Sequence, residues 1–288
     1  MCDHDTLERM KSTPKITRRS FAAITATAAA MAGTVAYGQA KVVEKDVTIK
    51  TPDGTADAAL FYPEGNAKHA AVLVWADIMG LRPVFREMGR RLASQGYVVL
   101  VPNPFYRSAK AADIVAANYD FSNPEGRAKL FGFRSAINDA GVDNDAKAFL
   151  AFLDTQPQVD KTKKAGVQGY CMGGPLSFRT AAAVPNRIGA VGSFHGGGLV
   201  TKEASSPHLL IAKTNAAYLV AVAENDDKTD PEAKNVLKKT FDDAKKTATV
   251  EVYPANHGWC VPGGGAYNAA SAEKAWGELG KLYGKALA

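Results

Sequence analysis

Short runs of apolar residues, separated by segments with a helical pattern, constrain the fold of this chain more than any other feature. Ala70–Trp75 (AAVLVW), Tyr97–Val101 and Tyr218–Ala223 are continuously apolar. Such strands are buried on both faces, as in a parallel sheet that helices cover. Apolar residues also recur with helical spacing in three longer segments, residues 84–92, 142–153 and 272–283. The sequence therefore predicts an α/β fold: a mostly parallel, doubly wound sheet flanked by helices.

Further strands are predicted where the pattern is weaker. A pair of strands is expected on either side of the turn signal Pro52-Asp53-Gly54. The remaining predicted strands are 165–169, 190–194 and 250–253. No internal repeat and no linker rich in Pro, Gly or Ser divides the chain, and 46% of its residues are hydrophobic. We therefore expect residues 41–288 to form a single domain.

The first forty residues resemble an export signal. Arg18 and Arg19 precede an uncharged stretch rich in Ala and Thr, Ala22 to Ala36, and small residues follow at Gly38-Gln39-Ala40. This order of charged, apolar and small-residue regions is typical of a secretory signal, and the paired arginines indicate the twin-arginine type. We expect a periplasmic or secreted protein; an amphipathic N-terminal helix or a retained anchor is the alternative. No other segment has the pattern of a membrane span.

Charge and cysteine content exclude several other classes. The net charge is +6, with 35 Lys and Arg against 29 Asp and Glu, and no basic block stands out. Nucleic-acid binding is therefore not indicated. Three cysteines do not make a disulfide framework, and no cluster of metal ligands is expected.

The segment Gly169-Tyr170-Cys171-Met172-Gly173-Gly174 has the form of a nucleophile elbow with cysteine as the nucleophile. It follows a predicted strand and precedes a helical pattern, and the sharp turn leaves little room for side chains at the flanking positions. A helix N-terminus at this point favours a thiolate. The alternative is a buried cysteine in a glycine-rich turn, for example in a nucleotide-binding loop.

The other two groups of a triad are predicted after later strands, in the order nucleophile, acid, base. His257 follows residues 250–253 and is the expected base. Asp226 is the favoured acid, three residues after the strand that ends at Ala223, and Asp227 is the alternative. The acid would fix the tautomer of His257 and stabilise its charged form. His195 precedes both acids in the chain, so we expect it to shape the pocket or to pack beneath it.

An oxyanion hole requires two backbone N–H groups. We expect one from Met172, directly after the nucleophile. The other is expected from the loop after Trp75, near Ile78.

Together these residues resemble the dienelactone hydrolase family over roughly residues 43–286. The elbow is similar to that family's Gly-Tyr-Cys-x-Gly-Gly, and further matching segments are Asp77–Gly80, Gln95–Tyr97, Pro102–Arg107, Ala140–Val142 and His257–Trp259. The resemblance implies an α/β-hydrolase fold, a Cys–Asp–His triad and hydrolysis of small esters or lactones without a cofactor.

The resemblance also implies a substrate pocket, with two departures from the family pattern. Asp77 stands where the family has a glutamate that contacts the resting cysteine. The type enzyme holds a substrate carboxylate with two arginines; Val261 replaces one, and Arg127 is the candidate for the other. We also expect Tyr170, His195 and Trp259 to line the pocket, with Trp259 and Cys260 forming an apolar rim.

Two other classes of function stay open at this point. An exported thiol redox protein would pair Cys171 with Cys260. A non-catalytic binding module could use the same fold. The expected partner in the leading interpretation is a small ester or lactone, and the expected assembly is a monomer or a small homo-oligomer.

Overall fold

The computed structural model describes residues 41–288, so the predicted export signal lies outside the described residues. All eight strands of this part of the chain belong to one sheet, in the spatial order β1-β2-β4-β3-β5-β6-β7-β8. Their bounds are β1 Val42–Thr51, β2 Gly54–Pro63, β3 Ala70–Trp75, β4 Tyr97–Pro102, β5 Ala165–Tyr170, β6 Ile188–Phe194, β7 Ala217–Ala223 and β8 Ala248–Tyr253. Each predicted strand corresponds to one of these.

The sheet is mostly parallel, as the sequence predicts. The six strands from β4 through β3, β5, β6 and β7 to β8 run parallel to one another. β2 pairs antiparallel with both β1 and β4, and the tight turn at Pro52 and Asp53 reverses the chain between β1 and β2. The central strands β3, β5 and β6 are buried at every residue, which explains the continuous apolar sequence of β3 and the small residues of β5 and β6.

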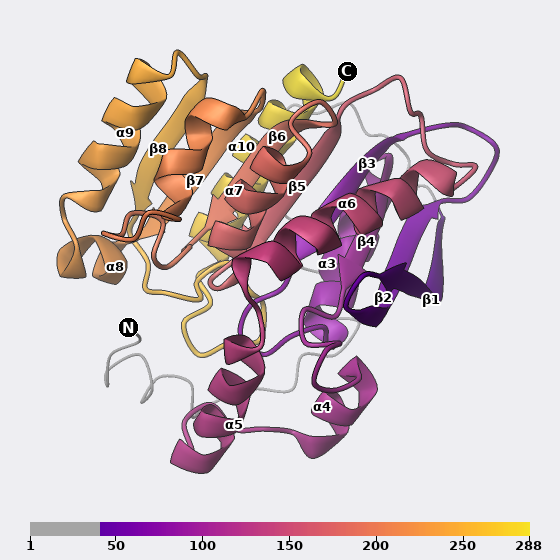
Figure 1. Ribbon diagram of the computed structural model, residues 1–288, viewed down its shortest axis with the longest axis horizontal. Coiled ribbons are helices and arrows are strands. Elements are labelled where there is room, and N and C mark those ends of the chain that lie inside the picture. Colours follow the sequence, from indigo (N-terminus) through magenta and orange to yellow (C-terminus); the bar gives the residue numbers. More distant parts are fainter. Residues whose placement is uncertain (1–40) are drawn as a thin grey trace.

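Helices cover both faces of the sheet (Figure 1). The apolar residues of α3 and α10 belong to one buried cluster, and those of α6, α7 and α9 belong to the other. The helices carry these residues at a spacing of three and four, so each one buries a single stripe. Their bounds are α3 Pro83–Ser94, α6 Asp139–Thr155, α7 Gly173–Ala183, α9 Ala233–Asp243 and α10 Ala269–Ala286.

The carboxyl edge of the sheet carries additional structure that the sequence analysis did not predict. α4 (Ala111–Ala117) and α5 (Pro124–Ser135) connect β4 to α6 and extend beyond the strands in Figure 1. A short helix, α8 (Glu224–Thr229), begins directly after β7 and carries Asp226 and Asp227. A 3-10 helix, Pro207–Lys213, lies between β6 and β7. Active sites of open parallel sheets lie at this edge.

None of the helices in residues 41–288 is both long enough and apolar enough to cross a membrane.

Candidate active site

Cys171 sits at the sharp turn between β5 and α7, in the left-handed backbone region with φ of 51°. A Cβ at Gly169 would lie 1.8 Å from the carbonyl oxygen of Gly173, and a Cβ at Gly173 would lie 2.5 Å from that of Trp75. Neither position can therefore accept a side chain, which explains the glycines of the elbow. The turn leaves the thiol half-buried at the N-terminus of α7, where the helix dipole stabilises negative charge.

His257 lies in the loop after β8 and contacts the carboxylate of Asp226. Its Nδ1 is 2.7 Å from Oδ2 of Asp226, and its backbone N–H donates to Oδ1 of Asn225 at 2.7 Å. The other ring nitrogen, Nε2, is buried and has no hydrogen-bond partner among the described residues. The imidazole is thus anchored on one side and available to Cys171 on the other.

The surroundings of His257 favour its protonated form. Desolvation alone would lower the pKa of this imidazole, but the negative charges of Cys171 and Asp226 and the hydrogen bond to Asp226 outweigh it. The net result is a pKa well above the ordinary value for histidine. This environment supports a thiolate–imidazolium pair.

The two adjacent acids after β7 take different partners because both lie in the first turn of α8, where successive side chains diverge. Asp226 contacts His257, whereas both carboxylate oxygens of Asp227 accept hydrogen bonds from Nζ of Lys234, at 2.7 and 2.8 Å. Asp227 is therefore occupied in an ion pair on the side of α9.

The loop after β3 lies beside the elbow. A Cβ at Gly173 would collide with the carbonyls of Trp75 and Ala76, so this loop and the start of α7 are in close contact. The backbone amides of Met172 and Ile78 donate no hydrogen bond to another described residue. Both remain available for an oxyanion beside Cys171.

Asp77 does not serve Cys171 in the way the resemblance implied. Nη1 and Nη2 of Arg82 donate to its two carboxylate oxygens at 2.5 and 2.8 Å, and the amide of Met79 donates to Oδ1 at 2.9 Å. The shorter aspartate is thus held within its own loop by Arg82 and makes no hydrogen bond to Cys171.

Arg134, near the end of α5, is a cation of the site that the sequence analysis missed. Its guanidinium interacts electrostatically with Cys171 and donates to the carbonyl of Ile137 at 3.1 Å. Burial lowers the pKa of Arg134, while Asp139 and Cys171 act in the opposite direction. The expected arginine, Arg127, lies on the same helix but makes no ion pair with another described residue. The two are seven residues apart, almost two turns, so they project from similar faces.

His195 lies directly after β6 and against the ring of His257. The two ring centroids are 4.8 Å apart at 63°, and only 1% of His195 is exposed. Both of its ring nitrogens are buried without a hydrogen-bond partner among the described residues. Burial and the nearby charge of His257 hold the pKa of His195 well below its usual value, so the ring is neutral.

Tyr170 and Trp259 lie in the core, and the expected apolar rim is not exposed. Tyr170 stacks on Phe194 at 5.0 Å, and its hydroxyl accepts from Nε2 of Gln168. Trp259 is fully buried and stacks on Tyr253 at 4.7 Å. Because side chains alternate along a strand, Tyr170 points into the layer covered by α3 and α10.

The two cysteines of the described chain are both free. Cys260 belongs to the buried cluster under α3 and α10, whereas Cys171 packs against the cluster on the opposite face of the sheet. Burial raises the pKa of the Cys260 thiol well above its usual value, which disfavours a reactive thiolate. These surroundings do not support redox pairing of the two thiols.

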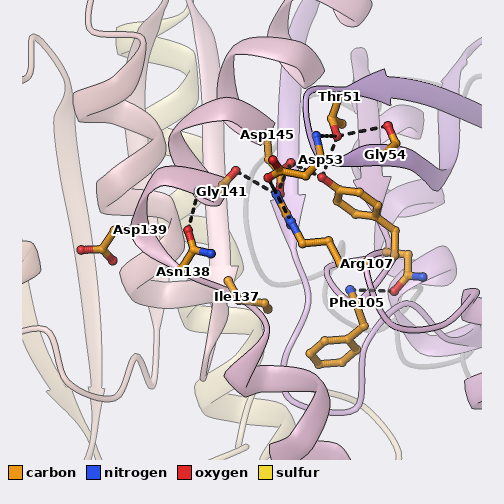
Figure 2. A network of polar contacts seen from close by, with 12 residues as sticks. Thr51, Asp53, Gly54, Phe105, Arg107, Ile137, Asn138, Asp139, Gly141 and Asp145 are labelled. Carbon is orange, nitrogen blue, oxygen red and sulfur yellow. Dashed lines mark hydrogen bonds and ion pairs between the residues drawn. The ribbon is translucent and has the colours of Figure 1, made fainter.

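A buried polar network around Arg107 holds the start of α6 (Figure 2). Arg107, after β4, bonds Asp145 of α6 through both terminal nitrogens at 2.9 Å, Asp53 of the β1–β2 turn at 2.6 Å and the carbonyl of Gly141 at 3.1 Å. The hydroxyl of Tyr106 donates to Asp145 at 2.6 Å. This network ties the start of α6, and with it the end of α5, to the sheet.

Comparison with known proteins gives a consistent assignment. The model of the dienelactone hydrolase family matches residues 56–287. A Synechocystis sp. protein, provisionally named a carboxymethylenebutenolidase, is 24% identical over 241 residues, which cover 82% of this chain and 94% of that protein. The carboxymethylenebutenolidase of Rhodococcus opacus is 29% identical over 119 residues, 41% of each chain. A Klebsiella pneumoniae crystal structure, provisionally assigned as a dienelactone hydrolase, matches with a TM-score of 0.74 at 21% identity, covering 85% of this chain and 99% of that one.

Proposed function

Because this chain belongs to the dienelactone hydrolase family, we propose that it cleaves small esters or lactones with Cys171 as the nucleophile. It is a carboxymethylenebutenolidase-like hydrolase. His257 acts as general base and acid, and Asp226 holds its ring. The observation that carries this assignment is the position of His257, anchored to Asp226 through Nδ1 at 2.7 Å and interacting electrostatically with Cys171.

The reaction has two halves. In the first, the sulfur of Cys171 attacks the carbonyl carbon, and the ester C–O bond breaks as His257 protonates the leaving oxygen. In the second, His257 takes a proton from water, the resulting hydroxide attacks the thioester, and the thiolate departs to leave a carboxylic acid. The amides of Met172 and Ile78 would stabilise the oxyanion in both halves.

Arg134 supports a substrate that carries its own negative charge. A half-buried guanidinium that interacts electrostatically with Cys171 can bind a carboxylate near the scissile bond, with Arg127 two turns earlier on α5 as a second contact. We therefore propose an acidic ester or lactone as the preferred substrate.

Substitution of the nucleophile tests the central assignment. Cys171→Ala should abolish hydrolysis of p-nitrophenyl acetate and leave the far-ultraviolet circular dichroism unchanged. Cys260→Ser is the matched control, since that thiol is buried and should not be needed for turnover. Full activity of Cys171→Ala would remove the proposal.

The acidic-substrate proposal has its own test. Arg134→Gln should raise KM for p-nitrophenyl hemisuccinate about tenfold, since a charge-assisted hydrogen bond is lost, and leave KM for neutral p-nitrophenyl butyrate nearly unchanged. Equal effects on both esters would refute a role in recognising charge.

We also propose that residues 1–40 direct export and that residues 41–288 form the mature domain. The support is the sequence pattern around Arg18 and Arg19. Replacing both arginines with lysine should retain the protein in the cytoplasm, as measured by cell fractionation and immunoblotting. Unchanged appearance outside the cytoplasm would contradict the twin-arginine route.

A further inference from the structure

His195 occupies a position where a polar ring is costly. It is 1% exposed, and neither Nδ1 nor Nε2 has a hydrogen-bond partner among the described residues. Buried polar atoms without partners destabilise a fold, and a phenylalanine of similar shape would avoid that cost. Packing alone therefore does not account for a histidine at this position.

The backbone holds His195 firmly against the proposed catalytic groups. Its φ is 40°, in the left-handed region that residues with a side chain rarely adopt, and its N–H donates to the carbonyl of Ala221 at 2.8 Å. The carbonyl of the preceding residue, Phe194, accepts from the N–H of Cys171 at 3.0 Å. The end of β6 is thus fixed between the elbow and β7, and local strain of this kind clusters at functional sites.

The ring of His195 makes its closest aromatic contact with His257, edge to face at 4.8 Å. Its other ring neighbours are Tyr170 at 6.2 Å and Trp259 at 6.3 Å. The charge of His257 lowers the pKa of His195. The hydroxyl of the neighbouring Tyr170 accepts a hydrogen bond from Gln168. A charge on His257 therefore develops against the neutral imidazole of His195.

We propose that His195 is a positioning residue: its ring packs against His257 and stabilises the imidazolium form of His257 beside Cys171. Without forming a hydrogen bond, a neutral imidazole presents a large dipole to an adjacent cation, whereas a benzene ring offers only its weaker quadrupole. The burial that makes the nitrogens costly also keeps His195 uncharged, so it supports the proton on His257 without competing for it. This inference rests on the proposed Cys171–His257 pair.

The proposal predicts effects of opposite sign on activity and stability. His195→Phe keeps the ring and removes both nitrogens. It should lower kcat for p-nitrophenyl acetate about tenfold at pH 8, with little change in KM, and move the alkaline limb of the kcat profile down by about one pH unit. Its thermal unfolding midpoint should equal or exceed that of the wild type. A purely structural role would not lower activity while preserving stability.

Alkylation of Cys171 provides a readout that does not require turnover. At neutral pH the rate constant for iodoacetamide should be lower in His195→Phe than in the wild type, because a less stable imidazolium on His257 holds a smaller fraction of Cys171 as the thiolate. Peptide mass mapping assigns the modified cysteine. His69→Phe is the matched control, because His69 is half-buried and precedes β3 at the opposite edge of the sheet.

The outcomes separate this inference from the proposed function. Full activity of Cys171→Ala would overturn both. Loss of activity in Cys171→Ala with wild-type kcat and pH profile in His195→Phe would overturn the role of His195 alone. A His195→Phe variant that loses activity only in proportion to lost stability would also overturn it.

Discussion

Replacing Asp145 with asparagine should expose how strongly the buried network of Figure 2 holds the carboxyl edge together. The side chain of Asp145 is 3% exposed, and its oxygens accept hydrogen bonds from Tyr106 and from two nitrogens of Arg107. The amide keeps the shape but removes the charge, so it leaves the Arg107 cation with only Asp53, whose side chain is 35% exposed.

The expected cost follows from the burial of the pair. Removing one partner of a buried ion pair costs about 3–5 kcal/mol, and Asp53 together with the remaining amide oxygen should hold the loss near the lower limit, about 3 kcal/mol. For a domain of this size that corresponds to a fall in Tm of roughly 6–12 °C. Asp243→Asn breaks the exposed pair with Lys239 and should lower Tm by less than about 2 °C.

Differential scanning calorimetry of both variants measures the stability effect. The consequence for the site is measured by the ratio of the Cys171 alkylation rates with iodoacetate and iodoacetamide. This ratio reports the positive potential of Arg134, and it should fall in Asp145→Asn because the network fixes the start of α6 beside Arg134. The reasoning would be refuted if Asp145→Asn had the same Tm as Asp243→Asn, or if its ratio of alkylation rates equalled that of the wild type.

Three further predictions address the site and the fold. Asp226→Asn should lower kcat by about 10²–10⁴-fold and shift the alkaline limb of the kcat profile to lower pH, because the carboxylate that raises the pKa of His257 is gone. Asp227→Asn should leave kcat nearly unchanged, and equal losses of kcat in the two variants would contradict the assignment of the acid. Burial lowers the pKa of His195 in the folded state, so below about pH 6.5 only the unfolded chain binds this proton. As pH falls below about 6.5, the free energy of unfolding of the wild type should therefore decrease relative to that of His195→Phe, by at most about 1.4 kcal/mol per pH unit. A difference in unfolding free energy between the two proteins that stays constant from pH 7.5 to 5.5 in urea unfolding would exclude this. A Cβ added at Gly277, on the exposed face of α10, meets no atom within 4 Å, so Gly277→Ala should stabilise the protein by about 0.5–1 kcal/mol. Urea unfolding measures this change, and a lower free energy of unfolding than in the wild type would contradict it.

The sequence alone determined the class of fold and the position of the elbow. Continuous apolar runs can be buried only between two layers of helices, and the strands they predict correspond to β3, β4 and β7. The glycine motif around Cys171 can also be recognised in the sequence, and the structure explains it: a Cβ at Gly169 or Gly173 would collide with backbone. The requirement at Gly169 involves a residue four positions away, whereas the one at Gly173 involves Trp75 of the adjacent strand and depends on the sheet.

The tertiary structure decided how the polar side chains are paired. Arg134 interacts electrostatically with Cys171, Arg82 binds the carboxylate of Asp77, and Tyr170 points into the core; none of these follows from spacing. Each depends on elements far apart in sequence meeting at one edge of the sheet, and on which face of a helix or strand then points inward. Burial keeps His195 neutral, and the nearby charges of Cys171 and Asp226 favour the protonated form of His257; both effects exist only once the layers have packed.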